Sequence, residues 1–279
     1  MSLYAVRIGA ARGWTEFVQS LTRAEEYIFN VLICGVILVV LWFQRDHAIA
    51  GTSLPLATLA LPGVVGMLLA FNATTGGAFV VAFEREDGTL LRARTVPHGI
   101  IGYLTGQAVR IPLNLAMCVL YILIPGLFLF DGLTGTNWLT FVWVFVLGLL
   151  ATLPLSMALG ALSSNPRVAA QWLGLLGAAL AAISGIFYPI TAMAAWLQSI
   201  AQVFPYYWLG LGMRSAMLPD EAKAVELDGS WRHLETVLVL GAWAVIGLLL
   251  APVLLRRMAR RESGARMQAG REKAAQRIG

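Results

Sequence analysis

Apolar blocks of about 17 to 30 residues dominate this 279-residue sequence. Apolar residues make up 58% of the chain and charged residues only 13%, which is more apolar sequence than a soluble protein of this length can bury. About 20 helical residues cross a hydrocarbon layer of ~30 Å, a length that matches the blocks. Because the runs are continuous rather than alternating, helices are favoured over a barrel. The sequence therefore predicts an all-α polytopic membrane protein.

The apolar blocks predict six transmembrane helices. The predicted spans cover residues 27–43, 57–83, 97–130, 138–162, 168–188 and 234–255. The second block is interrupted by Pro62 and by the run TTGG at 74–77. The third is longer than one straight crossing, so we expect it to tilt, to protrude, or to break near Pro112. The spanning domain is then 27–255, followed by a basic tail at 256–279.

Residues 1–26 predict an amphipathic helix that lies in the membrane interface. Apolar residues recur there at steps of three and four, namely Val6, Ala10, Trp14, Phe17 and Leu21. Charged residues lie off this stripe, and Trp14 is expected at the level of the lipid headgroups. A disordered leader with chance periodicity is the alternative. The run Thr22-Arg23-Ala24-Glu25 matches a capping box, so the first spanning helix is expected to begin at Thr22.

A stretch of 46 residues at 168–213 contains no Asp, Glu, Lys, Arg or His. A single crossing uses about half of that length. Pro189 and Pro205 punctuate its second half. The stretch therefore predicts span five followed by a re-entrant helical hairpin that dips into the outer leaflet, and a seven-span arrangement is the rival.

The distribution of Lys and Arg favours six spans over seven. With six spans, 15 of these residues lie on one side and 4 on the other, with Arg110 inside the third block. Basic residues accumulate on the cytoplasmic side, so both termini and the loop at 84–97 are expected in the cytoplasm, beneath a plasma membrane of the bacterial type. The basic tail lacks interleaved aromatic residues, which favours an anchor on anionic lipid over nucleic-acid binding.

Motifs for nucleotide and metal chemistry are missing from the sequence. A Walker A loop needs GxxxxGK followed by Ser or Thr, and neither Lys223 nor Lys273 follows a glycine. The three histidines have no second ligand at a metal-binding spacing, and both cysteines lie inside predicted spans. Asp and Glu are nearly absent from the spans, which argues against a proton-relay transporter. We therefore expect no catalytic residue, no metal and no cofactor in this chain.

Arg110 is the one clear charge inside a predicted span. It is compatible with facing an anionic substrate, with pairing structurally, and with lying near the surface of a span that projects from the bilayer. Asn114 lies four residues on, on the same helical face, and supports a polar lining. Asn72 and Thr75 can contribute to that lining from span two.

Small residues mark two faces for close helix packing. Gly102 and Gly106 form a GxxxG pair in span three. Gly174 and Gly177 place small residues in span five in a similar way. Both are packing signals before anything else.

Two stretches are similar to those of a known transporter family. The first is FEREDGTL at 83–90 followed by Pro97, which is similar to an E-R-E-x-G-T-L…P loop. The second runs from GIFYP at 185–189 through WL at 196–197 and FPYY at 204–207 to Arg214, and is similar to a G-x-x-x-P…W-L…P…R segment. Together with the spans and the hairpin, they make the chain resemble the permeases of ABC-2-type exporters over nearly its whole length. The daunorubicin-resistance-like drug exporters are the subfamily that it resembles most.

The resemblance implies ATP-driven export of a hydrophobic or amphipathic substrate, either drug-like or lipid-like. It also implies a separate ATPase subunit that binds ATP and Mg, and a second permease copy or paralogue in a homo- or heterodimer within membrane lipid. The glycine faces are candidates for contacts between the two copies. Export of a lipid-linked saccharide is a second hypothesis, and a sensor or structural subunit without flux is a third.

The resemblance also assigns expected roles to individual residues. The loop after span two becomes a coupling helix for the ATPase, formed by Glu84, Arg85, Glu86, Asp87, Gly88, Thr89, Leu90 and Arg94. The expected substrate pathway between spans two and five contains Asn72, Thr75, Arg110, Asn114, Phe187 and Tyr188. The expected outer gate contains Trp196, Phe204, Tyr206 and Tyr207.

Overall fold

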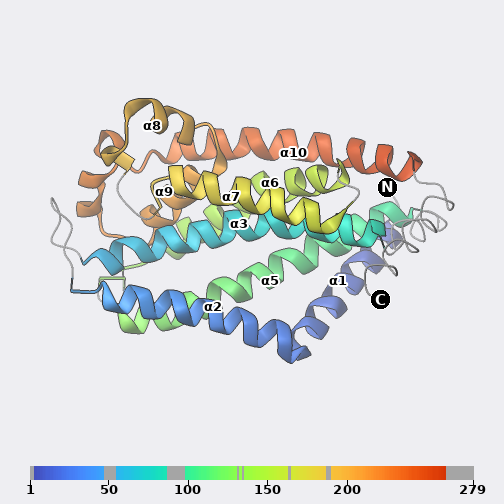
Figure 1. Cartoon of the computed structure of the whole chain (residues 1–279), viewed down its shortest axis with the longest axis horizontal. Helices are drawn as coiled ribbons and strands as arrows, with labels where there is room; N and C mark the ends of the chain where they lie inside the picture. The colour runs from blue at the N-terminus through green and yellow to red at the C-terminus, as the bar shows by residue number, and fades with distance from the viewer. Residues whose placement is uncertain are drawn as a thin grey trace.

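The computed structural model is an elongated bundle of helices (Figure 1). It describes residues 3–46, 55–86, 98–130, 132–133, 135–162, 165–186 and 190–261. The longer helices are α1 (Leu3–Thr22), α2 (Ala24–Phe43), α3 (Leu56–Glu86), α5 (Gly99–Leu129), α6 (Trp138–Leu162), α7 (Pro166–Ile183) and α10 (His233–Arg261). Shorter elements lie between α7 and α10, namely η1 (Ile190–Ala192), α8 (Ala195–Ala201), α9 (Pro205–Met217), η2 (Asp220–Val225) and η3 (Leu227–Gly229). No β-strand occurs in these ranges, as the all-α prediction requires.

Four helices are long and apolar enough to cross a membrane. They cover Leu56–Glu84, Ile101–Leu129, Trp138–Leu162 and His233–Leu255, and they match predicted spans two, three, four and six. Predicted spans one and five correspond to shorter apolar helices, Asn30–Phe43 and Val168–Ile183. The total of six spans therefore stays a prediction.

Helices α3 and α5 are each continuous over 31 residues, so α3 is not interrupted at Pro62 or at 74–77, and of the three alternatives for the third block the break near Pro112 does not occur. Pro62 lies inside α3 and Pro112 inside α5 without ending either helix. Proline is tolerated in membrane helices because neighbouring groups satisfy the freed backbone. At 1.5 Å per residue each helix is roughly 46 Å long, about 15 Å more than the hydrocarbon layer is thick. The end of α3 and the start of α5 lie at the end of the bundle that also contains α1, which packs on α5 (Figure 1).

The core lies around α3, which packs against α5, α6, α7 and α9. Helix α10 covers α6, and α2 lies along α5. Almost every residue of α9 is buried, because this short helix is enclosed by α3, α6 and α10. Leu61, Leu69, Leu209 and Met213 are among the fully buried side chains of α3 and α9.

Helix α1 packs along the first half of α5 through two glycine pairs. A Cβ atom at Gly9 would overlap the carbonyl oxygen of Gly102, and one at Gly13 would overlap that of Gly106. The predicted packing face on span three is therefore confirmed, but its partner is the N-terminal helix of the same chain. Gly102 and Gly106 are not available for the contact with a second copy that the sequence suggested.

The predicted capping box at the start of the first spanning helix is wrong. Thr22 ends α1, and its hydroxyl donates a hydrogen bond back to the Gln19 carbonyl oxygen at 2.8 Å. Helix α2 begins at Ala24, and its N-cap residue Arg23 makes no side-chain capping bond.

Helices α8 and α9 form a helical hairpin at the end of the bundle opposite α1 (Figure 1). The turn between them is fixed to α10, where the Trp243 indole N–H donates to the Val203 carbonyl oxygen at 2.7 Å. The rings of Phe204 and Trp243 are stacked with centroids 6.2 Å apart. The hairpin follows predicted span five, and its entry into a lipid leaflet stays a prediction.

Candidate functional site

A group of polar side chains gathers where α1, α3 and α5 meet, and we call it the three-helix polar cluster. Its members are Arg12, Glu16, Glu84, Tyr103, Gln107 and Arg110. In α1, the Arg12 Nε donates to Glu16 Oε1 at 2.6 Å. From α5, the Arg110 Nη1 donates to Glu16 Oε2 at 3.4 Å. Glu16 therefore binds one arginine of each helix, the first tightly and the second weakly.

The charge of Arg12 is stabilised by this arrangement. Burial works against the charged guanidinium, but the hydrogen bond to Glu16 and the negative charge of that carboxylate together raise the pKa of Arg12. Arg12 therefore remains cationic at any physiological pH.

Glu84 is the buried member of the cluster, with 9% of its surface exposed. The Gln107 side-chain amide donates to Glu84 Oε1 at 3.1 Å. Glu84 Oε2, the Gln107 carbonyl oxygen and the Tyr103 hydroxyl make no hydrogen bond of good geometry, although the Tyr103 hydroxyl lies next to the Glu84 carboxyl group. A buried polar atom without a partner is uncommon in native proteins, so three in one cluster require an explanation.

Asn114 continues the polar contact between the helices by one further turn. The Ser20 hydroxyl of α1 lies 2.8 Å from the Asn114 side-chain oxygen. Arg110 and Asn114 thus both face α1, where Glu16 and Ser20 are their partners. Counting about 20 residues back from Leu129 at the far end of α5 reaches Arg110, so we expect this contact near the bilayer surface. A role of Arg110 and Asn114 in the substrate pathway stays a prediction.

Sequence reasoning missed Glu16, Ser20, Tyr103 and Gln107. A signal was present, because polar positions 103, 107, 110 and 114 follow steps of four, three and four along one helical face. In α1, positions 12, 16 and 20 follow steps of four beside the glycines. That these two polar stripes face each other becomes evident only when α1 and α5 are seen packed together.

The predicted coupling residues are described only in part. Glu84 belongs to α3 rather than to a loop, and its carboxylate is turned into the bundle. Arg85 and Glu86 end α3, and their side chains are not described. Asp87, Gly88, Thr89, Leu90 and Arg94 lie outside the described residues.

Two predicted pathway residues on α3 bond to their own helix. The Asn72 amide donates to the Leu68 carbonyl oxygen and the Thr75 hydroxyl to that of Phe71, both at 2.8 Å. Both residues are half-buried, and neither is hydrogen-bonded to the Arg110 contact. Phe187 and Tyr188 lie outside the described residues.

The four predicted gate residues face different surroundings. Trp196 on α8 is exposed, and Phe204 stacks on α10. Tyr206 is buried where α9 meets α3 and α7, so that a Cβ at Gly177 would lie 2.9 Å from its hydroxyl and 3.0 Å from the Phe71 ring. Tyr207 is fully buried and packs edge-on against Trp208. The Tyr206 hydroxyl lies near Thr74 and the Tyr207 hydroxyl near Arg232, but neither makes a hydrogen bond of good geometry.

Arg214, the last residue of the second motif, forms a buried ion pair and also contacts the first residue of the motif. Arg214 binds Glu226 through two bonds, Nε to Oε1 at 2.5 Å and Nη2 to Oε2 at 3.2 Å. Both side chains are at most 6% exposed. The Arg214 Nη1 also donates to the Gly185 carbonyl oxygen at 3.4 Å, and Gly185 has a positive φ of 64°. The first glycine and the last arginine of the motif are therefore in contact across the hairpin.

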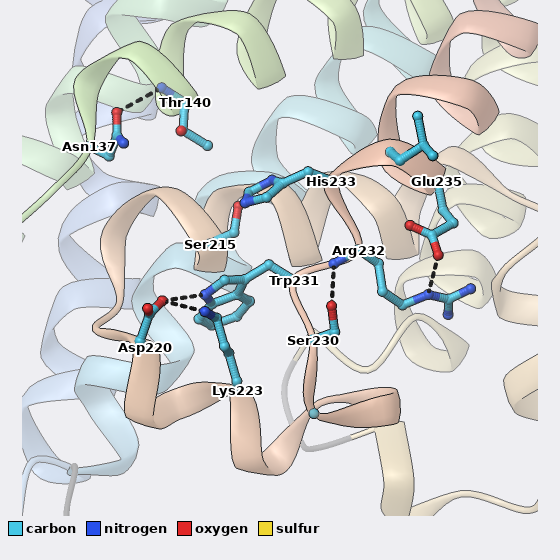
Figure 2. A pocket seen from close by; sticks show the side chains of 12 residues that line it. Asn137, Thr140, Ser215, Asp220, Lys223, Ser230, Trp231, Arg232, His233 and Glu235 are labelled. Carbon is cyan, nitrogen blue, oxygen red and sulfur yellow. Dashed lines mark hydrogen bonds and ion pairs between the residues drawn. The ribbon is translucent and has the colours of Figure 1, made fainter.

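A polar cavity of about 490 Å³ opens at the same end of the bundle (Figure 2). It is lined by the starts of α6 and α10, the end of α9, and the segment from η2 to Trp231. The Asp220 carboxylate accepts bonds from Lys223 at 2.7 Å and from the Trp231 indole at 3.2 Å, which lower the pKa of Asp220. Arg232 lies 3.6 Å from Glu235. These charges are already paired within the chain, and the described residues hold no cluster of His, Cys, Asp and Glu fit for a metal.

Comparison with known proteins adds the family. The search of curated proteins gives no match. A family model described as "ABC-2 type transporter" matches residues 6–218. The matched range begins in α1, contains the three-helix polar cluster and ends just after α9. Since this covers more than half of the sequence, the chain belongs to the ABC-2 type transporter family.

Proposed function

We propose that the chain is the permease subunit of an ATP-driven exporter, with ATP hydrolysis on a separate subunit. The observation that carries the proposal is the family match over residues 6–218, which makes the chain a transport permease. Partnership with an ATPase is general in this family. Neither lysine of the chain lies in a Walker A loop, so ATP and Mg belong to the partner.

The overhang of α3 and α5 supports docking of such an ATPase. These helices extend about 15 Å beyond one membrane thickness, and residues 87–97 connect their projecting ends. A partner that binds this connection displaces two of the central helices of the bundle together. ATP-dependent closure of the ATPase then rocks the bundle between inward- and outward-open states.

The contact between α3 and α7 supports a hydrophobic or amphipathic substrate. Its described surroundings include Phe71, Gly177 and the buried hydroxyl of Tyr206. An apolar lining with a few polar groups suits a drug-like or lipid-like molecule better than an ion. The substrate passes between this contact and the same contact of a second copy or paralogue, with Tyr206 toward the outer end. Gly35 and Gly174, which have open space around them, remain free for the second copy.

Export of a lipid-linked saccharide is the second candidate, and a sensor subunit without flux is the third. In all three, the chain lies in a bacterial-type plasma membrane with both termini in the cytoplasm. The two transport candidates differ in substrate alone, whereas the sensor requires no flux.

The test is reconstitution of the chain with the ATPase that copurifies with it, in inside-out vesicles. We expect ATP-dependent uptake of an amphipathic dye and stimulation of ATP hydrolysis by that dye. Reversing the charges of Glu86 and Asp87 to Lys should abolish both while the permease still inserts. ATP hydrolysis without uptake of any dye or lipid-linked sugar would leave the sensor, and unchanged uptake by the double variant would remove the docking role.

A further inference from the structure

The contact between Glu84 and Gln107 is half of a carboxylic acid–amide pair. Such a pair contains two antiparallel hydrogen bonds, one from the amide N–H to the acid carbonyl and one from the acid O–H to the amide oxygen. The first bond is present, from Gln107 Nε2 to Glu84 Oε1 at 3.1 Å. The two atoms that the second bond would join, Glu84 Oε2 and Gln107 Oε1, are both buried and without a partner. Both are acceptors when Glu84 is ionised, and even if the nearby Tyr103 hydroxyl donates to the carboxylate, no hydrogen atom lies between Glu84 Oε2 and Gln107 Oε1.

We propose that Glu84 carries a proton in this conformation, and that the Glu84–Gln107 contact between α3 and α5 is a proton-binding site. One proton on Glu84 Oε2 supplies the second hydrogen bond of the pair and satisfies two orphaned acceptors at once. Water at the bilayer surface supplies the proton and takes it back on release. The Tyr103 hydroxyl, next to the carboxyl group on the same helix face as Gln107, remains available to the Glu84 carbonyl oxygen.

The charged groups around Glu84 do not require it to be ionised. The groups that face it are Arg12 and Glu16 from α1, and Tyr103 and Arg110 from α5. Both arginines are bonded to Glu16, and Glu84 has no ion pair among the described residues. Helix α6, which packs against α3, contains no ionisable residue. In α7 the only ionisable residue is Arg167, whose side chain is not described.

Loss of the proton gives a second arrangement of the same residues. Ionised Glu84 needs a cation, and Arg110 lies one helical turn after Gln107 on the face that already contacts Glu84. The Arg110 bond to Glu16 is single and 3.4 Å long, whereas Glu16 keeps Arg12 at 2.6 Å. Arg110 can therefore move from Glu16 to Glu84, because Glu16 keeps its ion pair with Arg12. The exchange loosens α1 from α5 and ties the end of α3 to α5.

Infrared difference spectroscopy of the permease alone in nanodiscs tests the protonation state. The spectrum of the wild type minus that of Glu84→Gln should contain one carboxylic acid C=O band at pH 7. At alkaline pH the band should disappear as carboxylate bands appear. Carboxylate bands alone at pH 7 would overturn the proposal. Glu226→Gln is the matched control, because Glu226 is equally buried but bound by two bonds from Arg214, so its difference spectrum should show carboxylate bands only.

A second variant keeps the test open where Glu84→Gln fails to fold. Gln107→Leu removes both hydrogen bonds of the pair and leaves the acid in place. The acid C=O band should then move to higher frequency, as expected for a carboxylic acid that has lost its partner. An unmoved band, or no acid band in either protein, contradicts the acid–amide pair.

The consequence for energy coupling rests on the proposed function, whereas the infrared result does not. In the complex with the ATPase, substrate-stimulated hydrolysis by the wild type should depend on pH more steeply than that by Glu84→Gln. If the wild type and Glu84→Gln have equal pH profiles but the wild type shows the acid band, the proton-binding site stands and its role in energy coupling is rejected. The two failures are therefore distinguishable.

Discussion

Gly9 in α1 lies against the carbonyl oxygen of Gly102 in α5 so closely that no methyl group fits between them. Gly13 and Gly106 repeat the contact one turn later. The neighbouring atoms belong to the backbone of a helix, which cannot rotate away as a side chain can. The N-terminal helix is therefore packed as part of the bundle, with a fixed register against α5.

Replacement of Gly13 by Ala should force α1 away from α5. Overpacking of this kind costs about 1–3 kcal/mol, more than the ~0.5–1 kcal/mol that alanine gains over glycine in a helix. A lower midpoint of thermal unfolding in detergent measures the loss. Gly35→Ala is the control, because Gly35 has no neighbour within 4 Å and should leave the midpoint unchanged or slightly raised. Equal midpoints for the two variants would contradict the close packing.

A double-mutant cycle on Arg110 and Glu16 should show that these residues interact. Both side chains are 22–23% exposed and 3.4 Å apart, so we expect a coupling energy of at most about 1 kcal/mol. Arg110→Ala should remain folded, since Glu16 retains Arg12. If Arg110 also lines the substrate pathway, this stable variant should lose transport of anionic substrates selectively. Zero coupling energy would show that the 3.4 Å contact does not form in the membrane.

Loss of Arg214 should be among the most destabilising single changes in the chain. Arg214→Ala leaves the Glu226 carboxylate buried without a partner, and breaking a buried pair in this way costs roughly 3–5 kcal/mol. Arg214→Lys should recover only part of that, because an ammonium group cannot form both bonds of the guanidinium. Arg45→Ala is the control, since Arg45 pairs with Asp46 on the surface at 3.7 Å. A double variant of Arg214 and Glu226 that is no more stable than Arg214→Ala would argue against this explanation.

The ion pair at Asp220 should make stability depend on pH. Bonds from Lys223 and then Trp231 lower the pKa of Asp220 below its ordinary value of 3.8. A lowered folded-state pKa adds stability that is present above the ordinary value and is lost as pH falls through the folded one. The melting temperature of Asp220→Asn should therefore lie below that of the wild type at pH 7 and approach it at acid pH. Asp228→Asn, in the exposed turn nearby, should match the wild type, and a gap for Asp220→Asn that is constant with pH would disprove the linkage.

Cysteine labelling should place the two ends of the bundle on opposite sides of the membrane. Cys34 and Cys118 are buried, so a background with both replaced by Ala suits the experiment. Asp228→Cys should react with a membrane-impermeant maleimide in intact cells, and Arg257→Cys only after permeabilisation. Asp228 suits this experiment because its side chain is exposed, whereas that of the nearby Glu226 is buried. Labelling of Arg257→Cys in intact cells would rule out the proposed orientation.

The sequence predicted well whatever depends on length and average polarity. Four spans match because about 20 apolar residues in a row have few alternatives to a membrane helix. The sequence-based prediction failed where packing against other helices overrode a local sequence pattern. Pro62 and the run at 74–77 looked like breaks, yet α3 continues because α6 and α9 enclose it. In the same way, Thr22 looked like a helix start because a capping box is a local signal.

The candidate site was predicted only in part, because it joins residues far apart in the chain. Arg110 was recognised as an unusual charge, but its partner Glu16 lies 94 residues earlier. Glu84 was placed in a loop because charged residues follow it at once. Its burial depends on Gln107, which carries no charge and gave no signal by itself.

The fit between α1 and α5 has a consequence for the order of events during synthesis. The ribosome makes α1 first, yet the partner of Ser20 is Asn114, which emerges 94 residues later. At a synthesis rate of about 5–20 residues per second, roughly 5–20 seconds pass before the part of α5 that α1 packs against has been made. Leu3, Ile8, Trp14 and Val18 stay exposed even in the finished bundle, so the membrane surface can hold α1 during that interval. A nascent chain stalled before residue 99 should therefore have α1 bound to lipid and open to protease, and one stalled well after residue 114 should have it protected.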